Sequence, residues 1–415
     1  MEYVTFKSKN IMKNFKRALR ASQHIQQGEI IHFTIGSNMP LFKRNETVHN
    51  YVDAIVSEMM QNQIIENNFS KKELVKDIIS ILGHLDENNA LNKDFNALYN
   101  QLIAELENKI NNIIETEFDV FECYFHIENL KLDKELKIGD VTLFPVKSRE
   151  NFETLNEKIL TNFFKENEVY AKTRVYGSKN YAHTKSQTKI KIALNMLKLF
   201  LHDYECNFNL DGDIIYPKNR FYVLINSKNE ITGGFSPSSS NFGCDFNKDA
   251  IYDEFQLYIL SILFNNEPKS EIENRLITSI YWFGEAMSVQ FKHSSKIENK
   301  HNDPLENIEF FDGYSKLMYL IISLESLFVY NDDSKSKAIS KKVSALIANP
   351  GFEQEIEEFL RKIYDYRSKI VHSGIIYISN NDINRLIDCT RYAIFEVLYL
   401  NHFYHDKINN LILNY

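Results

Sequence analysis

Arginine and histidine stand five positions apart in YDYRSKIVHSG, the stretch from Tyr364 to Gly374. Histidine takes and gives a proton near neutral pH, and a guanidinium offers phosphate a fixed charge with paired donors. Arg367 and His372 therefore have the chemistry that RNA cleavage requires, because RNA supplies its own nucleophile in the 2′-OH. The ordinary alternative is charge complementarity, since cations stabilise the C-terminal end of a helix and Gly374 suits the position just past it.

A single carboxylate, Glu325, stands inside the otherwise apolar segment LMYLIISLESLFV. A carboxylate on or beside an apolar face is costly unless it is paired. Two roles are open for Glu325. It forms a salt bridge that locks the helices together, with Arg367 as one candidate partner, or it supports the site by orienting Arg367 or His372 and tuning the proton affinity of the histidine.

Residues of types that contact RNA in other proteins also stand near the arginine. Ser368 follows it directly, and a serine hydroxyl either hydrogen-bonds a phosphate or solvates a helix end. Lys362 and Lys369 add charge that can follow a phosphate backbone, and Tyr366 offers a ring for base stacking. The alternative is that the lysines cover a solvated helix face and the tyrosine packs between helices. The basic run SKSKAISKK has the same two interpretations, with Lys335, Lys337, Lys341 and Lys342.

The spacing of the pair decides how one site can form. An ideal helix turns about 100° per residue, so five positions separate two side chains by about 140°. Arg367 and His372 converge only if the helix ends between them or if a partner subunit completes the site. We therefore expect a homodimer through the C-terminal helices.

Helical periodicity returns at about Asn247 and continues to the C-terminal end, with apolar residues three and four apart. YNDD and NPG separate the later helices, and NPG is a strong stop-and-restart signal. This pattern predicts an antiparallel helical bundle with short connections. The helices are expected near Ile251–Phe264, Lys269–Phe291, Phe311–Val329, Ser334–Ala348, Phe352–Val371 and Asp382–Phe403.

Three features of this bundle occur together: RSKIVH, the Glu325 helix, and RLITSIYWFGEAMS followed by a long polar break. In order and spacing they resemble the HEPN superfamily, specifically its Apea-like branch. In that branch an Arg-Ser-x-x-x-His-Gly-type ending follows a helix with a Leu-Glu pair. Ser373 stands between His372 and Gly374, a departure that leaves the arginine and the histidine in place. The resemblance covers roughly Asn247 to Tyr415.

The resemblance implies a metal-independent endoribonuclease that works as a dimer. In this interpretation Arg367 binds phosphate and the transition state, His372 transfers protons and Glu325 supports them. Many such proteins act as toxins or in defence against phage. The resemblance also leaves room for an alternative, since other members are non-catalytic nucleotide-binding or dimerisation modules. A regulatory interaction protein, in which residues 1–246 do the binding, is a second alternative.

The preceding residues predict two more regions. Residues 1–116 show helical stripes, and residues 117–246 read as a mixed α+β unit. A half-buried strand is predicted by the alternation in FDVFECYFHIENL, and further strands by IGDVTLFPV and VYAKTRVYG. An amphipathic helix is predicted to start at Ser186, and a hairpin is predicted in RFYVLINSKNEITGG. The fold class is therefore mainly α with a smaller α+β part, in domains 1–116, 117–246 and 247–415. The N-terminal region has room for a restraining unit that responds to a trigger ligand or protein.

Composition limits the other possibilities. The net charge is −8 over 415 residues, so any RNA binding must be local. The four cysteines are widely separated, and no apolar run is long enough to span a membrane, which together favour a cytoplasmic protein. His402 and His405 stand three apart beside Asp406, but further ligands are not identified, so we expect no metal site. No glycine-rich phosphate loop is present, and no cofactor is expected.

Overall fold

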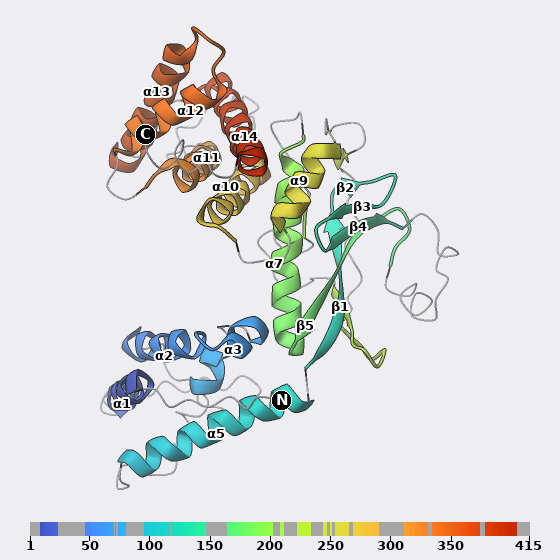
Figure 1. Ribbon diagram of the computed structural model, residues 1–415, viewed down its shortest axis with the longest axis vertical. Coiled ribbons are helices and arrows are strands. Elements are labelled where there is room, and N and C mark those ends of the chain that lie inside the picture. The colour runs from blue at the N-terminus through green and yellow to red at the C-terminus, as the bar shows by residue number, and fades with distance from the viewer. Residues whose placement is uncertain are drawn as a thin grey trace, which may run out of the picture. The chain divides into compact units, whose positions relative to one another are not determined.

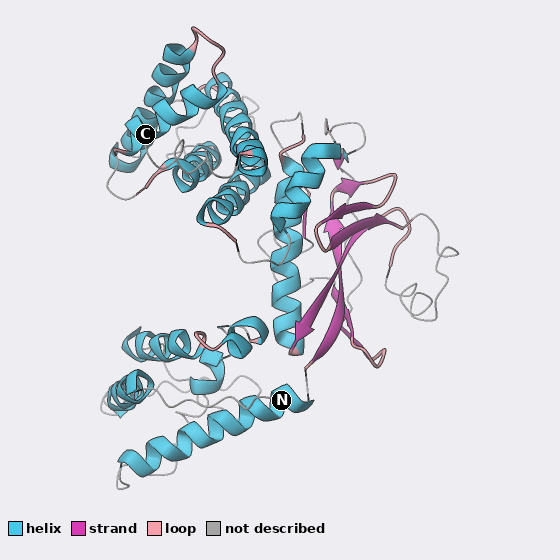
Figure 2. Cartoon of the chain, in the orientation of Figure 1, coloured by secondary structure: helices cyan, strands magenta, loops and turns pink. Residues whose placement is uncertain are grey.

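The computed structural model shows a chain that is mainly helical, with a smaller α+β part built on an antiparallel sheet (Figures 1 and 2). The fold class expected from the sequence is confirmed at this level. The structure describes residues 9–23, 46–69, 71, 74–79, 95–116, 118–146, 164–201, 208–210, 222–233, 244–246, 250, 254–264, 269–289, 311–330, 334–373 and 378–404.

The chain forms two compact units. One unit holds residues 1–123, 174–186 and 224–232, and the other holds residues 124–173, 187–223 and 233–415. The borders fall inside individual strands and inside one helix, so each of these elements contributes residues to both units. The three sequence domains at 1–116, 117–246 and 247–415 stay a prediction.

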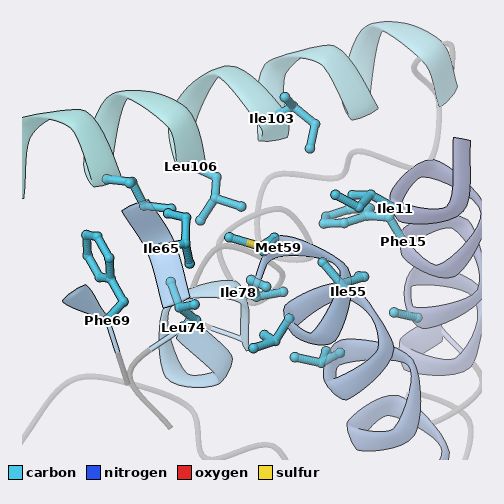
Figure 3. Packing of buried hydrophobic residues seen from close by; sticks show 14 of the residues in the cluster. Ile11, Phe15, Ile55, Met59, Ile65, Phe69, Leu74, Ile78, Ile103 and Leu106 are labelled. Atoms are coloured by element: carbon cyan, nitrogen blue, oxygen red, sulfur yellow. The ribbon is translucent and has the colours of Figure 1, made fainter. Parts of the chain in front are cut away.

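The first unit has a core between helices. Apolar residues three and four apart line one side of each helix, as the stripes in the sequence predict, and they form one buried cluster (Figure 3). The cluster includes Ile55, Met59 and Leu106, together with Ile11 and Phe15 near the start of the chain. The helices are α1 (Lys9–Gln23), α2 (Glu46–Met59), α3 (Gln63–Asn68) and α5 (Phe95–Thr116).

The sheet has the strand order β3-β4-β5-β1-β7-β8, with β6 paired to β1. In β4 and β5 Leu143 lies opposite Ala171, and both are fully buried, which explains the alternating pattern of these segments. The predicted hairpin is β7 and β8, and its turn uses Asn229 at φ 62°. The strands are β1 (Asp119–Glu128), β2 (Leu130–Lys131), β3 (Leu136–Ile138), β4 (Val141–Pro145), β5 (Val169–Gly177), β6 (Asn209–Leu210), β7 (Tyr222–Ile225), β8 (Ile231–Gly233) and β9 (Cys244–Asp245).

Helix α7 (Lys179–Lys198) begins before the predicted Ser186. The six C-terminal helices lie within a few residues of their predicted ranges: α9 (Glu254–Phe264), α10 (Glu271–Ser288), α11 (Phe311–Phe328), α12 (Lys335–Ile347), α13 (Glu353–Ser373) and α14 (Asn380–Phe403). Helix α10 packs against α11 and α14, and α12 packs against α13 and α14. Among the described residues, no helix combines the length and the apolar character that crossing a membrane requires.

Candidate functional site

Helix α13 carries both Arg367 and His372, and it runs without interruption to Ser373. Of the two ways in which the pair could converge, a helix that ends between the two residues is therefore excluded. No proline or glycine stands between them, so nothing local breaks the backbone hydrogen-bond ladder there. The two side chains leave the helix about 140° apart. Arg367 is half-buried and His372 is exposed.

Glu325 lies on α11 and joins three helices. The Tyr364 hydroxyl on α13 donates to Glu325 Oε1 at 3.1 Å, and Lys335 Nζ at the start of α12 lies 3.0 Å from Oε2. The carboxylate is thus paired, as its apolar surroundings require. Its ion-pair partner is Lys335, and not Arg367 as one sequence interpretation had it.

Tyr364 connects this network to Arg367 electrostatically. Burial is the main cause that raises the pKa of Tyr364, and the charge of Glu325 and its hydrogen bond raise it further. The Arg367 guanidinium acts in the opposite direction. Arg367 therefore lies within electrostatic reach of the Tyr364 hydroxyl, one turn away on the same helix.

Lys362 and Tyr366 make contacts that hold α13 against the start of α14. Lys362 Nζ lies 3.0 and 3.1 Å from the two carboxylate oxygens of Asp382, and the Tyr366 hydroxyl donates to the same group at 3.4 Å. The hydrogen bond to Asp382 raises the pKa of Lys362. Lys362 also lies 5.4 Å above the Tyr366 ring. Both residues are engaged within the protein, and their part in RNA binding stays a prediction.

The remaining predicted RNA contacts are divided between surface and core. Ser368 and Lys369 are exposed beside Arg367. In the basic run, Lys337 and Lys341 are exposed, whereas Lys342 is only 5% exposed and donates to the Phe328 carbonyl at 3.1 Å. Assigning Lys342 to a phosphate-binding surface is therefore wrong, because its charge stabilises the C-terminal end of α11.

Arg367 differs from the other described arginines of helices α10 to α14. Each of those four has a carboxylate within salt-bridge distance. No ion pair joins Arg367 to a described carboxylate, and its buried Nε has no hydrogen-bond partner among the described residues. The four pairs are Arg275–Glu271, Arg361–Glu357, Arg385–Glu355 and Arg391–Asp388.

Two residues of this site were not assigned their present roles from the sequence. From the sequence, neither Tyr364 nor Asp382 was assigned a partner in the helix packing. No local pattern identifies either role, since Tyr364 meets a residue 39 positions away and Asp382 meets one 20 positions away. The sequence indicates only that Glu325 needs a partner, because an unpaired carboxylate beside apolar residues is costly, and it does not identify that partner.

The described part of the chain contains no group of three or more histidines, cysteines or carboxylates able to hold a metal. His402 is exposed at the end of α14, where its ring contacts Phe255 and Phe403. His405 and Asp406 lie outside the described residues. No family model, curated protein or solved structure matches this chain, so the HEPN resemblance depends on the quoted residues alone.

Proposed function

We propose that the C-terminal helices of this protein form a metal-independent endoribonuclease, with Arg367 and His372 at the cleavage site. The observation that supports this most is that no carboxylate among the described residues pairs with Arg367. A guanidinium with no described carboxylate beside it keeps its charge for an external anion, and phosphate matches the geometry of its donors. The arginines that only stabilise these helices have carboxylates beside them.

The reaction needs two proton transfers and one charged transition state. A base takes the proton of the 2′-OH as its oxygen bonds to phosphorus, and an acid protonates the 5′-oxygen as its bond to phosphorus breaks. Histidine suits both tasks near neutral pH, and His372 is exposed to solvent and substrate. Arg367 stabilises the charge on the phosphoryl oxygens. The products are a 2′,3′-cyclic phosphate and a 5′-OH end.

A composite site formed by two copies of the chain follows from the continuous helix. Within one copy, Arg367 and His372 leave α13 on different sides, so one copy does not direct both at the same phosphate. Paired α13 ends about a two-fold axis bring an arginine of one copy beside a histidine of the other. Val371, next to His372, is 55% exposed and adds an apolar side chain to that surface.

Glu325 has a positioning role in this proposal. It does not contact Arg367 directly, but it holds Tyr364 one turn away on α13 and ties that helix to α11 and α12. Fixing the helix in this way fixes the direction from which Arg367 approaches a phosphate. Ser368 and Lys369 add exposed polar groups on the same turn.

The test is cleavage of a labelled RNA by purified full-length protein with EDTA present. Arg367→Ala and His372→Ala should each lower the rate at least 100-fold, as expected for loss of a proton-transfer or charge-stabilising group. Arg361→Ala on the same helix and His402→Ala at the end of α14 are the matched controls and should retain activity. If wild type cleaves nothing, if EDTA abolishes cleavage, or if both variants stay active, the proposal is wrong.

A second candidate function is nucleotide binding or dimerisation without cleavage. The angular separation of Arg367 and His372 within one copy favours it, because a single phosphate-binding arginine does not need the histidine. In that case wild type and His372→Ala bind a nucleotide equally, Arg367→Ala does not, and none of them cleaves RNA.

The HEPN resemblance extends the proposal to a biological role as a toxin or antiphage effector. Expression of wild type should then slow bacterial growth, and expression of His372→Ala at the same level should not. Equal growth of the two strains would argue against this role while leaving the in vitro activity to its own test.

A further inference from the structure

Helix α1 has two chemically distinct sides. Ile11, Phe15 and Ala18 are 2%, 3% and 0% exposed, and they belong to the core cluster of the first unit. In Figure 3 Ile11 and Phe15 extend from α1 into this cluster. The Phe15 ring meets Tyr99 of α5 edge-to-face at 6.1 Å. The apolar side of α1 is thus buried in the core of the first unit.

The opposite side of α1 is cationic. Lys9, Lys13, Lys16 and Arg17 are exposed, and their spacing of four, three and one places them on one face of the helix. They extend over about 12 Å at 1.5 Å per residue. Helix α1 contains no aspartate or glutamate.

We infer that this face of α1 binds the phosphate backbone of single-stranded RNA. Although the chain has a net charge of −8, this row of positive charges attracts a polyanion locally. The choice of RNA among polyanions rests on the proposed function, since an RNA-cleaving protein must hold its substrate. The electrostatic part of the inference stands without it.

Membrane binding does not fit this helix, although basic amphipathic helices often lie on lipid surfaces. Such helices bind by inserting their apolar side below the headgroups. The apolar side of α1 is buried against α2 and α5, so leaving the core for a bilayer would expose the first unit's cluster. The exposed side of α1 is therefore mainly charged, and Met12 is the one exposed large apolar side chain among the described residues of this helix.

The experiment uses a fluorescently labelled 2′-O-methyl oligouridine, which lacks the 2′-OH and so is not cleaved. Its binding to full-length protein is followed by anisotropy between 50 and 200 mM KCl. Four neutralised phosphates give a slope of about −2.8 in log affinity against log salt, which is about a 50-fold loss of affinity over this range.

The variant Lys9→Gln, Lys13→Gln, Lys16→Gln and Arg17→Gln should lose most of this affinity and salt dependence. Glutamine is a good helix former, so the helix should persist, which circular dichroism checks. The matched control removes four other exposed lysines and the same charge: Lys131→Gln, Lys134→Gln, Lys137→Gln and Lys228→Gln. It should bind nearly as wild type does.

Equal affinity of the folded α1 variant and wild type would overturn the inference. So would equal losses in the α1 and control variants, which would show an effect of net charge alone. If poly-L-glutamate displaces the RNA as well as an equal charge of unlabelled oligouridine, the face takes acidic polypeptides instead. Cleavage of unmodified RNA by the same proteins is measured separately. Binding without cleavage would contradict the proposed function and would still support RNA binding by α1.

Discussion

Tyr364 is the residue that ties the candidate site to the helix packing around it. Its side chain is only 9% exposed, and its hydroxyl donates to Glu325 at 3.1 Å. Hydrogen bonds to a charged acceptor are stronger than neutral ones because the charge increases the attraction. The pair therefore holds α13 in one rotational position, and the direction of Arg367 follows from it.

Replacing Tyr364 by phenylalanine removes the hydroxyl and keeps the ring. We expect a loss of about 1–2 kcal/mol in the free energy of unfolding at pH 7, since a hydrogen bond to a charged group is lost. Cleavage should fall less than in Arg367→Ala, because Tyr364 acts through position. Urea unfolding and single-turnover cleavage measure the two effects, and Tyr392→Phe at an exposed position of α14 is the control for losing a tyrosine hydroxyl.

The same substitution should change the response to alkali. Burial first, and Glu325 second, raise the pKa of Tyr364 above its ordinary value of 10.0 in the folded protein. The tyrosine therefore contributes its stability fully below pH 10, and loses it at higher pH, where the unfolded chain ionises and the folded chain does not. Wild type should lose unfolding free energy above pH 10 more steeply than Tyr364→Phe. Parallel pH profiles would contradict this assignment.

Two helix starts differ in how they are capped, although serine stands at both. Ser270 accepts from the Glu273 amide and Glu273 accepts from the Ser270 amide, which completes a capping box at α10. Ser334 begins α12 without a side-chain capping bond. Ser270→Ala should therefore cost about 1 kcal/mol of unfolding free energy, and Ser334→Ala far less. Equal costs in thermal or urea unfolding would show that the capping box adds nothing.

Helices α7 and α10 approach each other closely at a glycine. A Cβ added to Gly284 would lie 2.3 Å from Asn195 Cγ. The buried Lys198 reinforces this contact, because its ammonium donates to Asn195 Oδ1 at 3.1 Å, to the Gly284 carbonyl at 3.4 Å and to Ser288 Oγ at 2.6 Å. The absence of a side chain at Gly284 thus permits a polar junction inside the second unit.

Gly284→Ala should destabilise the protein by about 1–3 kcal/mol, because Asn195 must move out of a packed position. Helix propensity alone predicts the opposite, a gain of about 1 kcal/mol. The sign of the change in urea unfolding therefore distinguishes close packing from propensity. A stabilised variant would mean that α7 and α10 separate at little cost.

At the scale of the whole molecule, the continuous α13 makes the site depend on a second copy. Mixing Arg367→Ala and His372→Ala proteins should give heterodimers in which one copy supplies the missing arginine and the other the missing histidine. Up to half of the mixed dimers' composite sites are then complete, so activity should rise well above that of either variant alone. Analytical ultracentrifugation confirms the dimers, and a folded monomer with full activity would end the composite-site model.

The sequence by itself determined the local elements of this protein. The alternation of apolar and polar residues predicted β1, and the spacing of apolar residues by three and four predicted α9 to α14, because these periods follow from backbone geometry alone. Helix α13 is described as far as Ser373, and the stop expected at Gly374 lies outside the described residues. Of the two ways in which Arg367 and His372 could converge, the sequence disfavours an earlier helix end, since no proline or glycine stands between them.

The tertiary structure decided which charges meet. Glu325 needed a partner in any fold, but only the packing of α11 against α12 and α13 selected Lys335 and Tyr364 and left Arg367 without a described carboxylate. In the same way, Lys342 looks like Lys341 in the sequence, yet one is buried beneath the end of α11 and the other faces solvent. The physical reason is that pairing and burial depend on distances between segments far apart in the chain, which periodicity does not encode.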